Sequence, residues 1–192
     1  MKRTALNFLA LIVVLLPFTA FAQQNYEVKQ HSLVVEGTSN LHDWTAEAEN
    51  VSGNLKMKVE DGKITSINGI DVKVDASSLK ASKGSIMESK IDDALKVKKN
   101  PYIFFKSTGG TINDKAGAYK ITTNGVLTIA GVSKNISLDA VGKVLPNGQI
   151  EFTGSKTLKM TDYKVEPPKA MLGSLTTGDE ITLKYKVLVN PK

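Results

Sequence analysis

The stretch Ile70-Asp71-Val72-Lys73-Val74-Asp75 alternates apolar and charged side chains, and the alternation returns at Ile181-Thr182-Leu183-Lys184-Tyr185-Lys186-Val187. A period of two residues is typical of a β-strand, because successive side chains point to opposite faces of the sheet. Shorter alternating stretches lie at 26–29, 44–49 and 55–59. Each predicted strand therefore has one apolar face and one face rich in Lys, Glu and Thr, as in antiparallel sheets with one side toward water.

Dipeptides that favour turns lie between and within these strands. They are Asp61-Gly62, Asn68-Gly69, Asn124-Gly125 and Asn147-Gly148. Their residues tolerate positive φ, as tight hairpins require, although the pairs at 68–69 and 124–125 also suit bulges inside long strands. About eight or nine strands with short connections predict an all-β, antiparallel meander, which closes into a barrel or folds into a sandwich. An eight-stranded barrel is filled by side chains or holds a small ligand, and the pattern leaves both open.

One segment has helical rather than strand periodicity. Residues 85–98 space their apolar side chains at helical intervals, at Ile86 or Met87, Ile91, Ala94 and Leu95. Ser85 and Glu88 have the spacing of a capping box, and Pro101 limits continuation of the helix. The sequence therefore predicts one helix inserted between two blocks of strands.

The first 22 residues have the features of a secretory signal peptide. Lys2 and Arg3 precede the apolar run 8–18, which is shorter than a membrane span needs. Ala20-Phe21-Ala22 forms a small-x-small cleavage signal. We therefore expect residues 1–22 to be removed and the mature protein to be periplasmic or secreted; a retained anchor helix is the alternative.

The mature chain, residues 23–192, has the size of one domain, and no later segment is long or apolar enough to predict stable membrane insertion. The chain has no Cys, which excludes disulfides, thiolate nucleophiles and zinc–thiolate sites. Its formal net charge is +6, and Arg3 is its only Arg. Because Arg makes most bidentate contacts to guanine and phosphate, we expect scattered lysines to face solvent rather than nucleic acid.

The polar residues predict no catalytic or metal centre. His31 and His42 are the only histidines, and neither has a third ligand at a metal-binding spacing. Ser77-Ser78-Leu79-Lys80 matches the S-x-x-K of serine acylases without their companion motifs, which indicates a chance match. We expect no enzyme activity, no metal and no cofactor apart from a bound lipid. A hydrolase with catalytic groups drawn from distant strands stays open.

Apolar clusters give a more positive signal than the polar residues. Tyr102-Ile103-Phe104-Phe105 follows a proline, and a second cluster around Pro167-Pro168 contains Met160, Tyr163, Met171, Leu172 and Leu175. Methionine adapts to irregular apolar shapes, including lipids. Core packing and a lipid tunnel are both consistent with this set.

A series of motifs extends from Tyr26 to Val189. It comprises Gly37-Thr38-Ser39-Asn40-Leu41-His42-Asp43-Trp44, Asn100-Pro101-Tyr102-Ile103-Phe104-Phe105-Lys106-Ser107-Thr108, Gly125 to Lys134, Met160-Thr161-Asp162-Tyr163 and Gly178-Asp179-Glu180-Ile181. In this order they resemble the YceI-like family of periplasmic, polyisoprenoid-binding proteins, in its GTSxLHDW branch. The resemblance implies an extended, lipocalin-like antiparallel β-barrel that holds a long isoprenoid or similar amphiphile, with no enzymatic residues.

Strand alternation suggests which side chains would line such a barrel, because Leu127 shares a face with Ile129, and Ile103 with Phe105. The expected lipid-binding residues are Trp44, Met87, Ile91, Leu95, Ile103, Phe105, Leu127, Ile129, Met160 and Met171. Head-group candidates at the mouth are His42, Asp43 and Lys106. The expected partner is an apolar lipid. A homodimer and a structural barrel with a filled core stay open.

Overall fold

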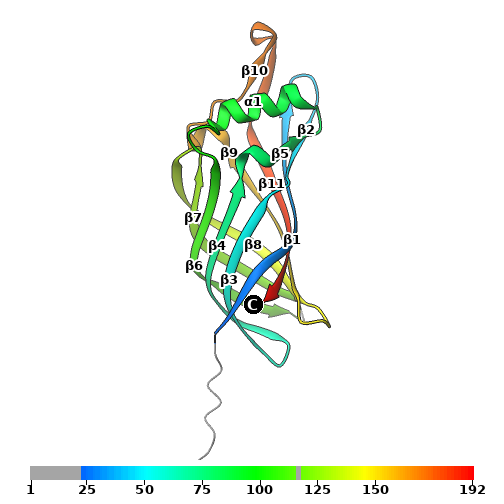
Figure 1. Cartoon of the computed structure of the whole chain (residues 1–192), viewed down its shortest axis with the longest axis vertical. Helices are drawn as coiled ribbons and strands as arrows, with labels where there is room; N and C mark the ends of the chain where they lie inside the picture. Colours follow the sequence, from blue (N-terminus) through cyan, green and yellow to red (C-terminus); the bar gives the residue numbers. More distant parts are fainter. Residues whose placement is uncertain (1–22, 116–117) are drawn as a thin grey trace, which may run out of the picture.

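The computed structural model describes residues 23–115 and 118–192, with the backbone alone at 115, 170 and 171. The predicted signal peptide, residues 1–22, lies outside the described residues. Within them, strands form an elongated antiparallel barrel, and one α-helix crosses one end of it (Figure 1). The prediction of an extended all-β barrel of about eight strands with one inserted helix is therefore confirmed.

Eight strands form the closed ring, and each pairs with its neighbours in antiparallel orientation. In ring order they are β1 (Gln24–Ser39), β3 (Val51–Glu60), β4 (Lys63–Asp75), β6 (Tyr102–Lys115), β7 (Ala118–Ile129), β8 (Val132–Val144), β9 (Ile150–Lys159) and β11 (Leu175–Pro191). Pairing of the first strand with the last, from Tyr26 opposite Pro191 to Ser39 opposite Thr177, closes the barrel.

The remaining elements are short and lie outside this ring. They are the strands β2 (Trp44–Ala48), β5 (Leu79–Ala81) and β10 (Lys169–Ala170), the helix α1 (Ser85–Leu95), and the 3-10 turns η1 (Ala76–Ser78), η2 (Met160–Tyr163) and η3 (Met171–Gly173). Figure 1 shows α1 and β10 at the same end of the barrel, away from the hairpins that join β3 to β4 and β8 to β9.

The barrel wall is incomplete toward the α1 end. β1 pairs with β3 only over Gln24–Glu27, and further along it pairs with β2 over Val34–Gly37. On another side, β8 pairs with β9 only over Ala140–Val144. The α1 end is therefore the end at which strands separate and short elements fill the gaps.

Side chains fill the opposite half of the barrel. Met57, Ile150 and Val189 are fully buried there. They belong to a core cluster that also contains Tyr26, Leu55, Ile64, Ile67, Tyr119, Ile121 and Phe152. Because these residues come from the strand ends near the two termini of the domain, the cluster plugs that end of the bore.

The helix is shorter than predicted. α1 ends at Leu95, because Lys96 adopts a left-handed conformation (φ 54°) and its N–H donates to the carbonyls of Asp92 and Asp93. This is a common way to end a helix, and it stops the element three residues before the predicted position 98.

The predicted capping box at the helix start is wrong. Gly84, with φ 78°, occupies the N-cap position, so Ser85 lies inside the first turn and makes no capping hydrogen bond. The Glu88 carboxylate instead accepts a hydrogen bond from the Ala81 N–H (3.3 Å) and pairs with Lys80 (3.5 Å). Glu88 therefore joins the helix to β5 rather than to its own N-terminus.

The four turn dipeptides divide into two kinds. Asp61-Gly62 forms the β3–β4 hairpin with positive φ at both residues, and Asn147-Gly148 lies in the β8–β9 connection. Asn68-Gly69 lies inside β4, where Lys56 and Met57 face Gly69 and Ile67 and leave Asn68 as a bulge. The remaining pair, 124–125, lies inside β7 opposite a register shift in β6. The bulge interpretation is thus correct for Asn68-Gly69 but wrong for the pair at 124–125, because the extra residue there lies in β6, between Ser107 and Gly110.

Candidate functional site

An apolar cavity of about 520 Å³ lies in the barrel between α1 and the plugged end. Its volume is within the range of small-molecule sites, roughly 300–1,000 Å³. Leu55, Ile67, Ile121 and Phe152 belong both to its lining and to the core cluster below, so they form its floor. The barrel is therefore a cup: packed at one end and hollow beneath the helix.

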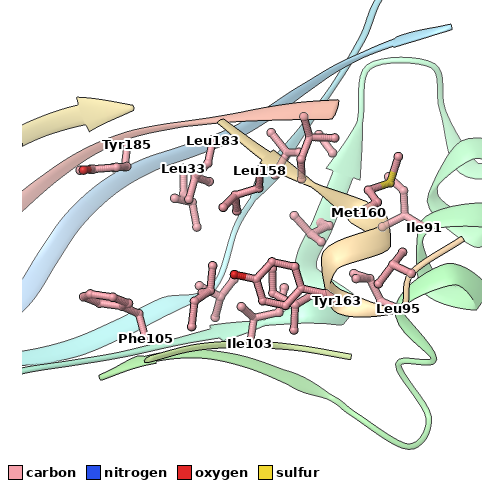
Figure 2. A pocket seen from close by; sticks show the side chains of 18 of the residues that line it. Leu33, Ile91, Leu95, Ile103, Phe105, Leu158, Met160, Tyr163, Leu183 and Tyr185 are labelled. Carbon is pink, nitrogen blue, oxygen red and sulfur yellow. The ribbon is translucent and has the colours of Figure 1, made fainter. Parts of the chain in front are cut away.

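Strand alternation builds the walls. On β4, Ile70, Val72 and Val74 line the cavity, while Asp71 and Lys73 between them are exposed. The same rule applies to the other strands, because every second side chain of a closed barrel points inward. Figure 2 shows Leu33, Ile103, Leu158 and Leu183 projecting from different strands into one space, with Ile91 and Leu95 of α1 at its edge.

The structure brings the sequence-predicted apolar residues together. Lining side chains include Trp44, Met87, Ile91, Leu95, Ile103, Phe105, Leu127, Ile129 and Met160. The side chain of Met171 lies outside the described residues. The other nine residues therefore share one cavity wall. Their contact with a lipid stays a prediction.

The three head-group candidates separate. His42 lines the cavity, whereas its neighbour Asp43 is exposed and is not part of the lining. Lys106 does not reach the cavity, and its placement at the mouth is wrong. It follows the inward-facing Phe105 on β6, so alternation directs it to the outer face, where it pairs with Asp71 at 3.4 Å.

Sequence reasoning missed much of the wall. Leu33 and Val35 of β1 line the cavity, as do Ile136, Leu138 and Ala140 of β8. The β8 residues alternate with polar ones and were detectable by the period of two. In β1, three consecutive apolar residues hide which face is inward, and the pairing with β11 is what settles it.

The GTSNLHDW segment is a tight connection between β1 and β2. The Ser39 hydroxyl accepts a hydrogen bond from the His42 N–H (3.1 Å) and donates one to the His42 carbonyl (2.7 Å). The Trp44 indole N–H donates to the Thr38 carbonyl (3.1 Å). Asn40 exchanges hydrogen bonds with Thr176 of β11. These contacts hold Trp44 in the wall and His42 at its edge.

The charged side chains along the cavity are lysines. The lining contains four of them, and no carboxylate; we call them the mouth lysines, Lys83, Lys90, Lys159 and Lys169. All four are exposed; Lys83 lies in the turn before α1, Lys90 in α1, Lys159 at the end of β9 and Lys169 in β10. Within residues 23–115 and 118–192, none of them forms a salt bridge. Hydrogen bonds from Thr161, with a smaller contribution from the Lys159 charge, lower the pKa of the nearby Asp179 carboxyl group.

Few polar side chains lie inside the cavity. The Thr123 hydroxyl donates to the Leu138 carbonyl (3.5 Å), and the Tyr185 hydroxyl donates to the Asp139 carbonyl (2.7 Å). Burial, with a smaller contribution from the Asp139 charge, raises the pKa of Tyr185 to about 12. Tyr163 is buried as well, and burial followed by the Asp162 charge raises its pKa. These phenols are neutral at physiological pH.

The described residues contain no group of three or more His, Asp or Glu side chains close enough to hold a metal ion. His31 lies outside the cavity, where its Nε2 donates to the Ala48 carbonyl at 3.2 Å. Among the same residues, no helix has both the length and the apolar character of a membrane span.

The chain is similar to a known protein family. The model of the YceI-like domain matches residues 26–189. Comparison with curated protein sequences gives no significant match.

Three solved structures have the same fold. A polyisoprenoid-binding domain from Saccharophagus degradans, implicated in plant cell wall breakdown, is 12% identical; the match covers 89% of this chain and 100% of that chain, with a TM-score of 0.67. BcnA from Burkholderia cenocepacia is 19% identical, with 85% and 99% coverage and a TM-score of 0.64. A Campylobacter jejuni YceI protein is also 19% identical, with 100% and 99% coverage and a TM-score of 0.57.

Proposed function

From the premise that this chain belongs to the YceI-like domain family, we propose that it binds a polyisoprenoid or similar long-chain amphiphile inside its barrel. The observation that carries the proposal is the apolar cavity of about 520 Å³, closed below by a packed core. The similarity to a domain described as polyisoprenoid-binding supports this class of ligand. The sequence left open a barrel filled by its own side chains. In the structure, side chains fill only the half of the barrel below the cavity floor.

Burial of a hydrocarbon tail supplies the driving force. A tail that loses about 400 Å² of apolar surface to the cavity gains on the order of 10 kcal/mol, before the costs of association. No covalent contact or metal is needed for such binding. Because the floor residues close one end, the tail extends toward Phe152 and Ile121, and the head group lies nearer α1.

The mouth lysines favour some head groups over others. Four exposed ammonium groups with no carboxylate in the lining create a positive potential around the opening. This potential attracts an anionic head group, tolerates a neutral one and repels a cationic one. Of the three head-group candidates predicted from the sequence, His42 is the one that lines the cavity and lies where it could contact a head group.

We further propose that the protein is a non-catalytic carrier exported to the periplasm. The Thr123 and Tyr185 hydroxyls are engaged with backbone carbonyls, and no carboxylate lines the cavity that would serve as a general base. The tyrosine pKa shifts point away from activated nucleophiles. Export rests on the signal-peptide features of residues 1–22.

A cavity-filling variant tests the proposal. Ala140 lines the cavity, and its neighbour Val141 faces outward with 48% of its surface exposed. We expect Ala140→Phe to lower affinity for tritiated geranylgeraniol, a 20-carbon isoprenoid alcohol, by more than about tenfold, because the added ring occupies tail space. Val141→Phe, the matched control, retains wild-type affinity.

Equal binding by wild type and a folded Ala140→Phe protein would contradict a tail in the barrel. Absence of saturable binding to wild type, for this alcohol and for its phosphate, would contradict the carrier role itself. If Ala140→Phe does not fold, Leu138→Trp replaces it, because Leu138 is the next inward position on β8.

A further inference from the structure

Tyr163 has a buried hydroxyl with no hydrogen-bond partner. Only 2% of the residue surface is exposed, and its Oη is the one buried side-chain polar atom without a partner in residues 23–115 and 118–192. Buried hydroxyl groups are nearly always hydrogen-bonded, because removing one from water without compensation is costly. The other tyrosine in the cavity lining follows this rule, since the Tyr185 hydroxyl bonds the Asp139 carbonyl.

The orientation of Tyr163 is fixed by its neighbours. The Asp179 carboxylate of β11 accepts hydrogen bonds from the Thr161 N–H (2.9 Å) and the Thr161 hydroxyl (2.7 Å), which anchors η2. The Val165 N–H donates to the Met160 carbonyl (3.1 Å) and closes the turn. These hydrogen bonds hold the η2 backbone on both sides of Tyr163, and the Tyr163 side chain is buried in a cluster with Phe105, Leu127, Met160 and Val165.

The hydroxyl points into the cavity. Figure 2 shows the Tyr163 ring extending from η2 away from Leu95, with its oxygen in the space between Ile103 on one side and Leu33 and Leu158 on the other. All of these residues belong to the cavity lining. The unpartnered atom thus lies where the proposed ligand would lie.

Water is a poor partner for this hydroxyl. An ordered internal water needs two to four polar partners, whereas the side chains around Tyr163 in its core cluster are Phe105, Leu127, Met160 and Val165. The Thr123 and Tyr185 hydroxyls already donate to backbone carbonyls. An oxygen atom of an otherwise apolar ligand could accept the hydrogen bond of the Tyr163 hydroxyl, and it would need no further polar partners in the cavity.

We propose that Tyr163 is a ligand-recognition residue whose hydroxyl donates a hydrogen bond to an oxygen atom of the bound lipid, inside the barrel and beneath α1. The inference rests on the proposed function and narrows its ligand class. The cavity selects an oxygen-bearing isoprenoid or acyl chain, such as an alcohol, ketone or ester, over a hydrocarbon of the same length. Burial raises the Tyr163 pKa, so the phenol keeps its proton for this bond at physiological pH.

A cycle of two ligands and two proteins tests the inference. Phytol and phytane share a branched 20-carbon skeleton, but only phytol carries a hydroxyl. Affinities of wild type and Tyr163→Phe for both are measured by displacement of a fluorescent fatty acid, with the ligands delivered from cyclodextrin. We expect Tyr163→Phe to weaken phytol binding about fivefold and to leave phytane binding unchanged, as loss of one hydrogen bond predicts.

The controls separate recognition from folding. Tyr102→Phe removes a phenol from an exposed tyrosine that does not line the cavity, and it leaves both affinities unchanged. Tyr163→Phe is at least as stable as wild type, because it removes an unpartnered buried group. Equal loss, or no loss, for both ligands overturns the assignment of Tyr163 while the carrier role stands. Binding of neither ligand to wild type overturns both.

Discussion

Gly37 lies against the indole of Trp44: the two residues are paired across β1 and β2, and a Cβ at residue 37 would lie 2.5 Å from Cε2 of the ring. No real Cβ approaches an aromatic carbon so closely, so any larger residue displaces the ring. The glycine that opens the GTSNLHDW motif and the tryptophan that ends it are thus one packing unit. Through Trp44 this unit forms part of the cavity wall.

Replacement of Gly37 by alanine is expected to destabilise the fold by about 2 kcal/mol, as overpacking typically does. Guanidinium denaturation followed by tryptophan fluorescence measures the change, since Trp44 is the only Trp. Gly69→Ala is the matched control. Its Cβ would meet nothing nearer than 3.8 Å, so its stability should stay within about 0.5 kcal/mol of wild type. Equal stability of both variants would contradict the packing relationship.

Leu127→Lys is expected to abolish ligand binding or to destabilise the protein by several kcal/mol, because it places an ammonium group in an apolar wall. Leu127 is 6% exposed and lines the cavity, whereas the preceding Val126 is 40% exposed on the outer face. Val126→Lys should therefore bind and unfold like wild type. Thermal unfolding and probe displacement report both effects, and full binding by a folded Leu127→Lys protein would place residue 127 outside the site.

Removal of charge at the mouth should reduce affinity for an anionic amphiphile. Changing Lys83, Lys90, Lys159 and Lys169 together to Gln is expected to weaken hexadecanoate binding on the order of tenfold at low salt, with a smaller effect at high salt because exposed charges are screened. Hexadecylamine should bind the variant better than wild type. A control carries the same change at exposed lysines away from the cavity, Lys56, Lys120, Lys134 and Lys143. Identical losses in both quadruple variants would show that net charge, not the mouth, is responsible.

Stability should fall as the pH rises from about 10 to about 12, in part because of Tyr185. Its folded pKa, raised by burial and by Asp139 to about 12, exceeds the ordinary value of 10.0. Between these values the unfolded chain releases the proton and the folded chain keeps it, so the contribution of this tyrosine is complete below pH 10 and is lost above it. Denaturation of wild type and Tyr185→Phe across this range should show a stability difference that shrinks with pH; a constant difference would contradict the shift.

The barrel was predictable because alternation is local. Because side chains of a strand alternate between its two faces, Ile70, Val72 and Val74 point inward. Asp71 and Lys73, which lie between them, point outward, and the sequence alone predicts this arrangement. Phe105 and Leu127 were identified in the same way. The same rule explains why Lys106 does not reach the mouth, since the residue after an inward-facing Phe105 points outward.

Other features depend on long-range contacts that no local pattern encodes. The Gly84 conformation makes Gly84 rather than Ser85 the N-cap, and Glu88 binds Ala81 and Lys80 instead of forming a capping box. The mouth lysines come from positions as distant as Lys83 and Lys169, and the sequence presents them as ordinary surface charges. The unpartnered Tyr163 hydroxyl likewise emerges only when the residues around it are known.

If the protein is a lipid carrier, its cavity is occupied by a lipid in the cell. The most direct measurement is mass spectrometry of an organic extract from the protein purified without detergent from its native host, compared with Ala140→Phe prepared identically. We predict a long-chain, oxygen-bearing lipid in near-stoichiometric amount with wild type, and its loss from the cavity-filled variant. Absence of any lipid from wild type, or the same lipid in equal amount from both proteins, would contradict the central claim.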